Sequence, residues 1–127
     1  MSRSVLLIED NEQNRYLLTF LLERSGYHVN VATDGMSGIL AARTSVPSII
    51  LLDIQLPTMD GYTVAKALRS EESLRDVPIV AVTSYAMPGD REKAMAAGCS
   101  GYIEKPIDPE TFVAELEASV SRRGGAP

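Results

Sequence analysis

The segment "SIILLDIQLPTMDGY", residues 48–62, places a carboxylate directly after an apolar run. The run "SIILLD", residues 48–53, has the length and composition of a strand that is buried on both faces of a sheet. Asp53 ends that run, and a carboxylate in this position is unfavourable unless a nearby group compensates for its charge. Asp60 and Gly61 then provide a candidate N-cap and a permissive first position for a helix. The segment therefore predicts a strand, a loop and a helix, with an acidic residue at the strand end.

Similar apolar runs recur along the chain and alternate with amphipathic segments. The other predicted strands are "SVLLIE" (4–9), "PIVAVT" (78–83), "GYIEK" (101–105) and the less buried, alternating "HVNVA" (28–32). Helical patterns occupy residues 12–26, 34–45, 60–70, 87–98 and 108–123. Strands that alternate with helices favour a parallel sheet covered on both faces. We predict an α/β fold, a flavodoxin-like doubly wound parallel sheet of five strands in the order 2-1-3-4-5, with five helices.

Two of the predicted helices carry patterns that a structure can test. In the first helix, apolar residues recur at three- and four-residue intervals at Tyr16, Leu17, Phe20 and Leu21. In the last helix, Asp108 is the expected N-cap and Pro109 the first helical residue, because proline is tolerated there.

The length and composition favour a single domain and exclude several function classes. The chain has 127 residues, so we expect one domain over residues 1–127, with a core at about 4–121 and a frayed tail at 122–127. The net charge of −5, without a basic block, argues against direct binding to nucleic acid. No apolar run approaches the roughly 20 residues that span a bilayer, which argues against a membrane partner.

The counts of cysteine and histidine restrict the chemistry further. Cys99 is the single cysteine, so an internal disulfide is impossible and a reducing compartment is favoured. His28 is the single histidine, which weakens every hydrolase that needs a Ser–His or Cys–His pair. We expect a cytoplasmic protein that is a monomer or a weak dimer.

Polar residues lie at the carboxyl ends of four of the five predicted strands. Glu9 and Asp10 lie at the end of the first, while Asp53 ends the third, Thr83 the fourth and Lys105 the fifth. The carboxyl ends of parallel strands meet at one edge, and in the order 2-1-3-4-5 the first and third strands flank the ligand crevice. Three carboxylates in one crevice repel one another, so a cation or a lysine is needed to compensate for their charge.

The residues at this edge predict chemistry on phosphate. Ligands that are all oxygen indicate Mg²⁺, with Mn²⁺ or Ca²⁺ as alternatives. Lys105 adds a point charge that suits a phosphoryl oxygen or Asp53, and Thr83 adds a hydroxyl. A carboxylate can attack a phosphoryl group to give an aspartyl phosphate. Asp53 is therefore the candidate nucleophile.

Four motifs at these positions resemble one known family. They are "LLIEDN", "LLDIQLPTMDG", "PIVAVTSYAM" and "GCSGYIEKPI", and the match runs from about Ser4 to Val120. In this order and spacing, they resemble the receiver domain of bacterial two-component response regulators, in the style of single-domain, phosphorelay members. The resemblance implies that Asp53 is the phosphoacceptor.

The resemblance also implies a set of metal ligands. Asp10 and Asp53 are expected to bind Mg²⁺ directly, with Mn²⁺ as the substitute. The backbone carbonyl of Gln55 is the expected third protein ligand, and Glu9 is expected to act through a water molecule.

A second set of residues is implied to respond to the phosphate. Thr83 resembles the switch hydroxyl and Tyr102 the switch aromatic, while Lys105 resembles the residue that pairs with phosphoryl oxygens. The bond between Lys105 and Pro106 is expected to be cis, as it usually is in the family. Ser84 departs from the family pattern, which commonly has Ala or Gly there.

These implications predict a signalling phosphoacceptor that is not an enzyme but assists its own phosphorylation and slow dephosphorylation. The donor would be a histidine kinase or a histidine phosphotransfer protein, with Asn14 and Arg15 as candidate contacts, and the downstream protein is unknown. One alternative is a hydrolase with an aspartyl nucleophile, which generally needs a further acid where this chain has Gln55. A second alternative is an interaction domain that has lost the chemistry, which the intact acidic set disfavours.

Overall fold

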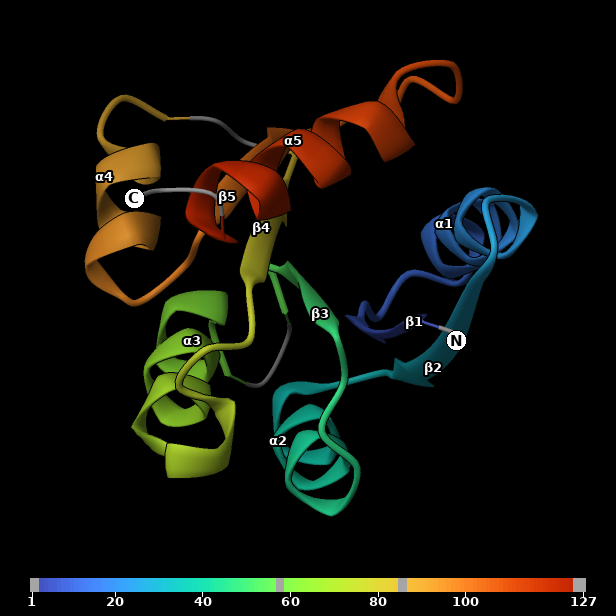
Figure 1. Cartoon of the computed structure of the whole chain (residues 1–127). Coiled ribbons are helices and arrows are strands. Elements are labelled where there is room, and N and C mark those ends of the chain that lie inside the picture. The colour runs from blue at the N-terminus through green and yellow to red at the C-terminus, as the bar shows by residue number, and fades with distance from the viewer. Residues whose placement is uncertain (1–2, 57–58, 85–86, 125–127) are drawn as a thin grey trace.

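The five predicted strands form one parallel sheet in the predicted order. The computed structural model describes residues 3–56, 59–84 and 87–124. The strands run β2-β1-β3-β4-β5 across the sheet, and each neighbouring pair is parallel (Figure 1). Their bounds are β1 Arg3–Ile8, β2 Tyr27–Ala32, β3 Ile49–Asp53, β4 Ile79–Thr83 and β5 Gly101–Glu104. The predicted doubly wound α/β fold is confirmed.

The five predicted helices are present, and three of them begin after a capping side chain. Their bounds are α1 Glu12–Arg24, α2 Gly35–Thr44, α3 Gly61–Ser70, α4 Asp90–Ala96 and α5 Phe112–Gly124, and a 3₁₀ helix η1, Glu72–Leu74, follows α3. The side chains of Asn11, Asp34 and Asp60 accept hydrogen bonds from backbone N–H groups in the first turns of α1, α2 and α3. Within the described parts of the chain, no helix is long and apolar enough to cross a membrane.

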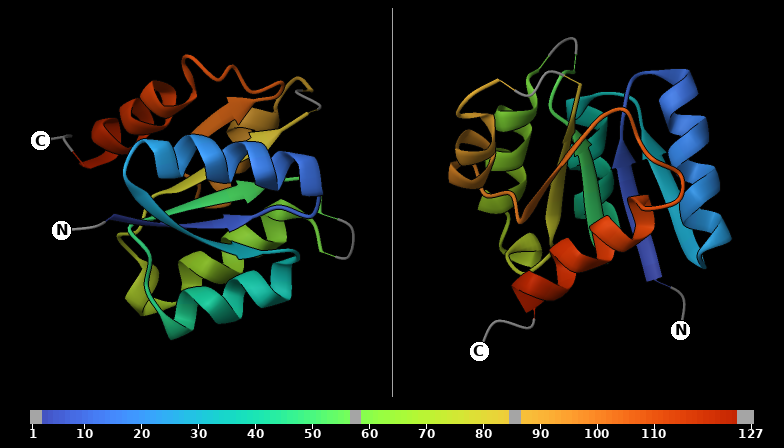
Figure 2. Two further views of the ribbon diagram at one scale, coloured as in Figure 1. Left: turned by 90° about the vertical axis from the view of Figure 1, so that its right-hand side faces the viewer. Right: turned by 90° about the horizontal axis from the view of Figure 1, so that it is seen from above.

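Two helical layers enclose the sheet. Helices α1 and α5 lie on one face, and α2, α3 and α4 lie on the other (Figure 2). Every residue of β3 is buried, which explains the apolar run before Asp53. In β2 the pattern is mixed, as expected for the strand at the edge of the sheet. The sheet is therefore covered on both faces, and its carboxyl edge carries the polar residues.

Helix α1 buries only part of the apolar pattern that the sequence shows. Leu18, Leu21 and Leu22 are buried, whereas Tyr16 is 78% and Phe20 52% exposed. Both sets of residues recur at helical intervals, so the spacing alone does not decide which set faces the sheet. Of the residues in the sequence pattern, Leu21 is buried and Leu17 packs against the core, whereas Tyr16 and Phe20 face solvent.

The last helix also begins later than predicted. The Asp108 carboxylate accepts a hydrogen bond from the backbone N–H of Glu110 at 2.9 Å, which stabilises a turn. Pro109 lies in this turn, and α5 begins at Phe112, whose ring is fully buried between α5 and the sheet. Asp108 therefore caps a turn that precedes the helix.

Candidate functional site

The sheet register brings the polar strand ends together. Ile8 in β1 lies opposite Leu52 in β3, so Glu9 and Asp53 come next to each other at the carboxyl edge. On the other side of β3, Asp53 lies opposite Val82, and Thr83 follows directly in β4. Three neighbouring strands thus contribute to one region, at the point where the connections from β1 and β3 leave toward opposite faces of the sheet.

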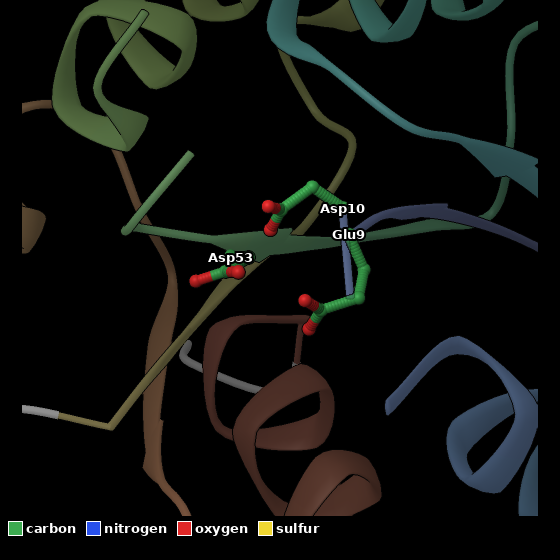
Figure 3. Close-up of side chains that lie close together, drawn as sticks. All are labelled: Glu9, Asp10 and Asp53. Carbon is green, nitrogen blue, oxygen red and sulfur yellow. The ribbon is translucent and has the colours of Figure 1, made fainter. Parts of the chain in front are cut away.

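Three carboxylates form the centre of this region. Glu9, Asp10 and Asp53 each offer one oxygen atom, and these atoms all lie within 4.8 Å of one another. Figure 3 shows the three carboxylates turned toward a common space. Glu9 and Asp53 are only 1% and 4% exposed, whereas Asp10 is exposed and leaves the cluster accessible from solvent.

Lys105 supplies a positive charge to this cluster. Its Nζ lies 3.0 Å from Glu9 Oε1 and 3.7 Å from Asp53 Oδ2, and the side chain is only 10% exposed. The peptide bond from Lys105 to Pro106 is cis. The lysine contacts Glu9 more closely than Asp53, so it bridges the two buried acids.

The surroundings of Asp53 disfavour its ionised form. The pKa of Asp53 is raised to about 6, chiefly because the carboxyl group is buried and further because Glu9 lies beside it. The backbone N–H of Gln55, which donates to Asp53 Oδ1 at 2.8 Å, and the charge of Lys105 act in the opposite direction. One lysine therefore does not compensate fully for three clustered carboxylates.

Gln55 has a second contact that the sequence did not predict. Its side-chain Oε1 accepts a hydrogen bond from the backbone N–H of Ser84 at 3.1 Å. This contact joins the loop after β3 to the end of β4, above the Asp53 carboxylate that the Gln55 N–H also holds. Gln55 therefore links two loops of the site through its side chain as well as its backbone.

Gly61 allows the start of α3 to lie in direct contact with the backbone that follows β3. The N–H of Gly61 donates to the carbonyl of Ile54, and a Cβ at position 61 would lie 2.4 Å from the Ile54 Cα. Only glycine allows this close approach of the two backbones. The loop after Asp53 is thus anchored at its far end by Gly61.

Arg15 contacts the acidic segment from α1. Its Nη1 donates to the carbonyl of Asp10 at 2.7 Å and to the carbonyl of Glu9 at 3.3 Å. Helical side chains point back toward the N-terminus, so a residue in the first turns can reach the preceding loop. The sequence analysis assigned Arg15 only to the contact with a phosphodonor, and missed this internal role.

Thr83 and Tyr102 lie on the same face of the sheet. Thr83 lies opposite Glu104, and Tyr102 is two residues before it in β5, so strand alternation places both on the face covered by α4. The Tyr102 ring is buried, and its hydroxyl has no hydrogen-bond partner among the described residues. The guanidinium carbon of Arg91 lies 5.3 Å from the centre of that ring.

The donor set fits a hard divalent cation. All three candidate side-chain ligands are carboxylates, and neither the single histidine nor the single cysteine belongs to the cluster. Oxygen ligands and solvent access suit Mg²⁺, which keeps several water molecules when it binds to proteins. The charge balance and the donor chemistry therefore both support a cation at Glu9, Asp10 and Asp53.

The fold and the acidic pocket define the class of doubly wound α/β domains that bind ligands at the switch point between β1 and β3. A profile of the response regulator receiver domain matches residues 5–117. The chain belongs to the response regulator receiver domain family. It is 42% identical over 118 residues to the polar-differentiation response regulator DivK of Brucella ovis, and the match covers 93% of this chain and 96% of DivK.

Solved structures of related proteins share the fold. The receiver domain of the sensor histidine kinase PA1611 from Pseudomonas aeruginosa PAO1 is 35% identical, with a TM-score of 0.84 over 99% of this chain and 100% of that one. In that structure a magnesium ion is coordinated in the active site cleft. The chemotaxis protein CheY4 of Vibrio cholerae has a TM-score of 0.89 at 28% identity, covering 94% of this chain and 99% of CheY4. The chain is thus a receiver domain of the DivK and CheY type, and it acts in two-component or phosphorelay signalling.

Proposed function

We propose that Asp53 is the phosphoacceptor and takes a phosphoryl group from a phosphohistidine. The observation that carries the proposal is the convergence of three carboxylates within 4.8 Å, with Lys105 Nζ at 3.0 Å from Glu9 and 3.7 Å from Asp53. In the reaction, an Asp53 oxygen attacks phosphorus, the P–N bond breaks, and the imidazole keeps the electron pair. The product is an aspartyl phosphate and a free histidine on the donor.

The contacts of Asp53 indicate which of its oxygens reacts. Oδ1 accepts the hydrogen bond from the Gln55 N–H, which holds the carboxylate in place. Oδ2 lies on the side of Lys105 and is the attacking atom in our proposal. Lys105 then donates to a phosphoryl oxygen, and the Thr83 hydroxyl, at the end of the neighbouring strand, donates to another.

We propose that Mg²⁺, or Mn²⁺ in its place, is held by Asp10, Asp53 and the backbone carbonyl of Gln55, with Glu9 acting through water. When bound, such a cation supplies positive charge that neutralises the carboxylates and the phosphoryl oxygens. The chain itself keeps the ligands together, because Glu9 and Asp53 lie on neighbouring strands whose register is fixed.

The response to phosphate is proposed to pass through Thr83 and Tyr102. The new charge at Asp53 draws the Thr83 hydroxyl toward it, and Tyr102, on the same face, changes its position. Its buried hydroxyl without a partner among the described residues supports a second favourable position for this side chain. The affected surface is that of α4, β5 and α5, which would bind an unknown downstream protein.

The surface of α1 supports docking of a histidine kinase or a histidine phosphotransfer protein. Tyr16 and Phe20 are 78% and 52% exposed, and they lie on the helix that follows the acidic segment. Exposed aromatic residues close to a reactive site are typical of protein-binding surfaces. We therefore propose that the donor covers this face of α1. We further propose that the chain is a single cytoplasmic receiver domain, a monomer or weak dimer, and not an enzyme.

A labelling experiment tests the phosphoacceptor role. Incubation with acetyl phosphate and Mg²⁺ should add one phosphoryl group to each chain, measured as intact mass, and Asp53→Asn should abolish the labelling. Labelling that persists in Asp53→Asn would overturn the assignment. Release of many phosphate equivalents per chain at high rate would instead favour the aspartyl-nucleophile hydrolase. An unlabelled wild-type chain would favour an interaction domain without phosphate chemistry.

A further inference from the structure

We infer that Arg15 is a positioning residue for the acidic pocket. It holds the segment that carries Glu9 and Asp10 in the arrangement that binds a divalent cation. The inference deepens the proposed function and rests on it, because the pocket is the one in which Asp53 is proposed to react. It assigns to Arg15 a role inside the chain in place of the donor contact that the sequence predicted.

The geometry of Arg15 supports this role. A single nitrogen, Nη1, donates to the carbonyls of two consecutive residues, at 2.7 Å to Asp10 and 3.3 Å to Glu9. The backbone N–H of Arg15 donates to the carbonyl of Asn11 at 2.9 Å, as part of the first turn of α1. The helix and the loop before it are thus joined through both the backbone and the side chain of one residue.

The segment that Arg15 contacts is short and carries much of the site. Only residues 9–11 connect the end of β1 at Ile8 to the start of α1 at Glu12. In the same segment, the Glu9 N–H donates to the carbonyl of Ala32 and the Asn11 N–H donates to Glu9 Oε2. The side chains of Glu9 and Asn11 accept from Lys105 Nζ and from the Asn14 N–H. Arg15 adds the contacts to the two carbonyls, and therefore fixes the planes of both peptide bonds that follow Glu9 and Asp10.

Fixing these peptide planes has a consequence for the carboxylates. The direction of a side chain follows from the orientation of the backbone on either side of its Cα. Glu9 and Asp10 must point toward Asp53 even though their charges repel one another. A guanidinium that binds the carbonyls opposes rotation of the segment away from the cluster. Groups that orient metal ligands in this way typically change metal affinity by about 10- to 100-fold when they are lost.

Affinity for Mg²⁺ separates a positioning role from a docking role. Arg15→Met removes the donors and keeps an apolar stem, while Arg15→Lys keeps a cation that can donate to the same carbonyls. Gln13→Met, at an exposed position of the same helix, is the matched control. Mg²⁺ binding is measured by isothermal titration calorimetry, and labelling by acetyl phosphate under subsaturating Mg²⁺. Folding of each variant without metal is checked by far-UV circular dichroism.

We expect Arg15→Met to weaken Mg²⁺ binding about tenfold and to slow labelling in proportion, with substantial recovery in Arg15→Lys and no change in Gln13→Met. Should Arg15→Met fail to fold, Arg15→Gln replaces it with the same expected loss. Unchanged Mg²⁺ affinity and labelling in a folded variant would overturn the inference and return Arg15 to the donor surface. Failure of the proposed function has a different signature, an unlabelled wild-type chain. The Mg²⁺ affinities of the variants would still decide the role of Arg15.

Discussion

Asp53 combines two properties that conflict in an ordinary folded protein. It is 4% exposed, yet the reaction that we propose for it requires a charged oxygen. Burial and the Glu9 carboxylate raise its pKa to about 6, so a protein without bound cation loses stability when Asp53 ionises. Lys105 compensates for part of this charge, and a bound cation would compensate for more. The environment that the proposed reaction uses therefore lowers the stability of the cation-free protein.

This conflict predicts that Asp53→Asn is more stable than the wild type when no divalent ion is present. The folded pKa lies above the ordinary value of 3.8, so the folded state binds the proton more tightly and stability falls as pH rises from about 4 to about 6. At pH 8 the variant should be more stable by about 1–3 kcal/mol, and the difference should shrink at pH 5. Urea unfolding in EDTA, followed by circular dichroism, measures both values.

The control for this prediction is Asp76→Asn, which changes the same charge at an exposed position. Its effect should be small and similar at both pH values. A variant at Asp53 that is less stable than the wild type at pH 8 would show that the carboxylate is stabilising, contrary to the electrostatics of the pocket.

At the scale of elements, Arg69 joins three segments on the face opposite α1. Its Nε and Nη2 donate to the carbonyl of Gly98, at 3.0 and 2.7 Å. Its Nη1 donates to the carbonyls of Leu74, Arg75 and Val77. One side chain at the end of α3 therefore holds η1, the start of β4 and the turn that leads to β5.

Removing this side chain should destabilise the fold more than removing a surface arginine. We expect Arg69→Met to lower the free energy of unfolding by about 2–4 kcal/mol, because several partly buried carbonyls lose a charged donor. Arg43→Met is the control, since Arg43 makes a surface ion pair with Glu71 at 2.8 Å and should cost less than about 1 kcal/mol. Urea denaturation measures both variants. Equal losses would mean that the Arg69 contacts do not stabilise the fold.

At the scale of the whole molecule, the site is built from the ends of several strands, and the helices next to those strands differ in local stability. Thr83 ends β4 and Lys105 follows β5, and α4 connects these two strands. Helix α4 has seven residues, and its N-cap, Gly89, provides no side-chain hydrogen bond, whereas Asp34 caps α2. A short helix without a capping side chain is a segment of low local stability. A change at the site should therefore be felt first around α4.

Hydrogen exchange tests this expectation. With Mg²⁺ and beryllofluoride, which mimics a phosphoryl group on a carboxylate, amide exchange should change more in residues 87–104 than in α2. Mass spectrometry of peptides from the exchanged protein measures both regions, and Asp53→Asn is the control in which neither should respond. A change that is uniform over the chain, or greatest in α2, would contradict a response that passes through Thr83 and Tyr102.

The sequence predicted the fold because its signals are local and repeated. The run Ile49–Leu52 reads as a buried strand without any knowledge of its neighbours, and β3 is indeed fully buried. The cap Asp60 also lies where the sequence placed it. The spacing left open which apolar residues of α1 face the sheet, because Tyr16 and Phe20 recur at helical intervals as the buried leucines do, and only the position of the sheet distinguishes the two sets.

The sequence by itself determined the order of strands and helices, and which acidic residues meet at the carboxyl edge, since these follow from periodicity and parallel connections. Only the tertiary structure decided the contacts among the side chains. The main examples are the ion pair of Lys105 with Glu9, the hydrogen bond from the Ser84 N–H to Gln55, and the hydrogen bonds from Arg15 to the carbonyls of Glu9 and Asp10. The physical reason is that hydrogen bonds depend on distances of a few tenths of an ångström between atoms, and packing fixes those distances.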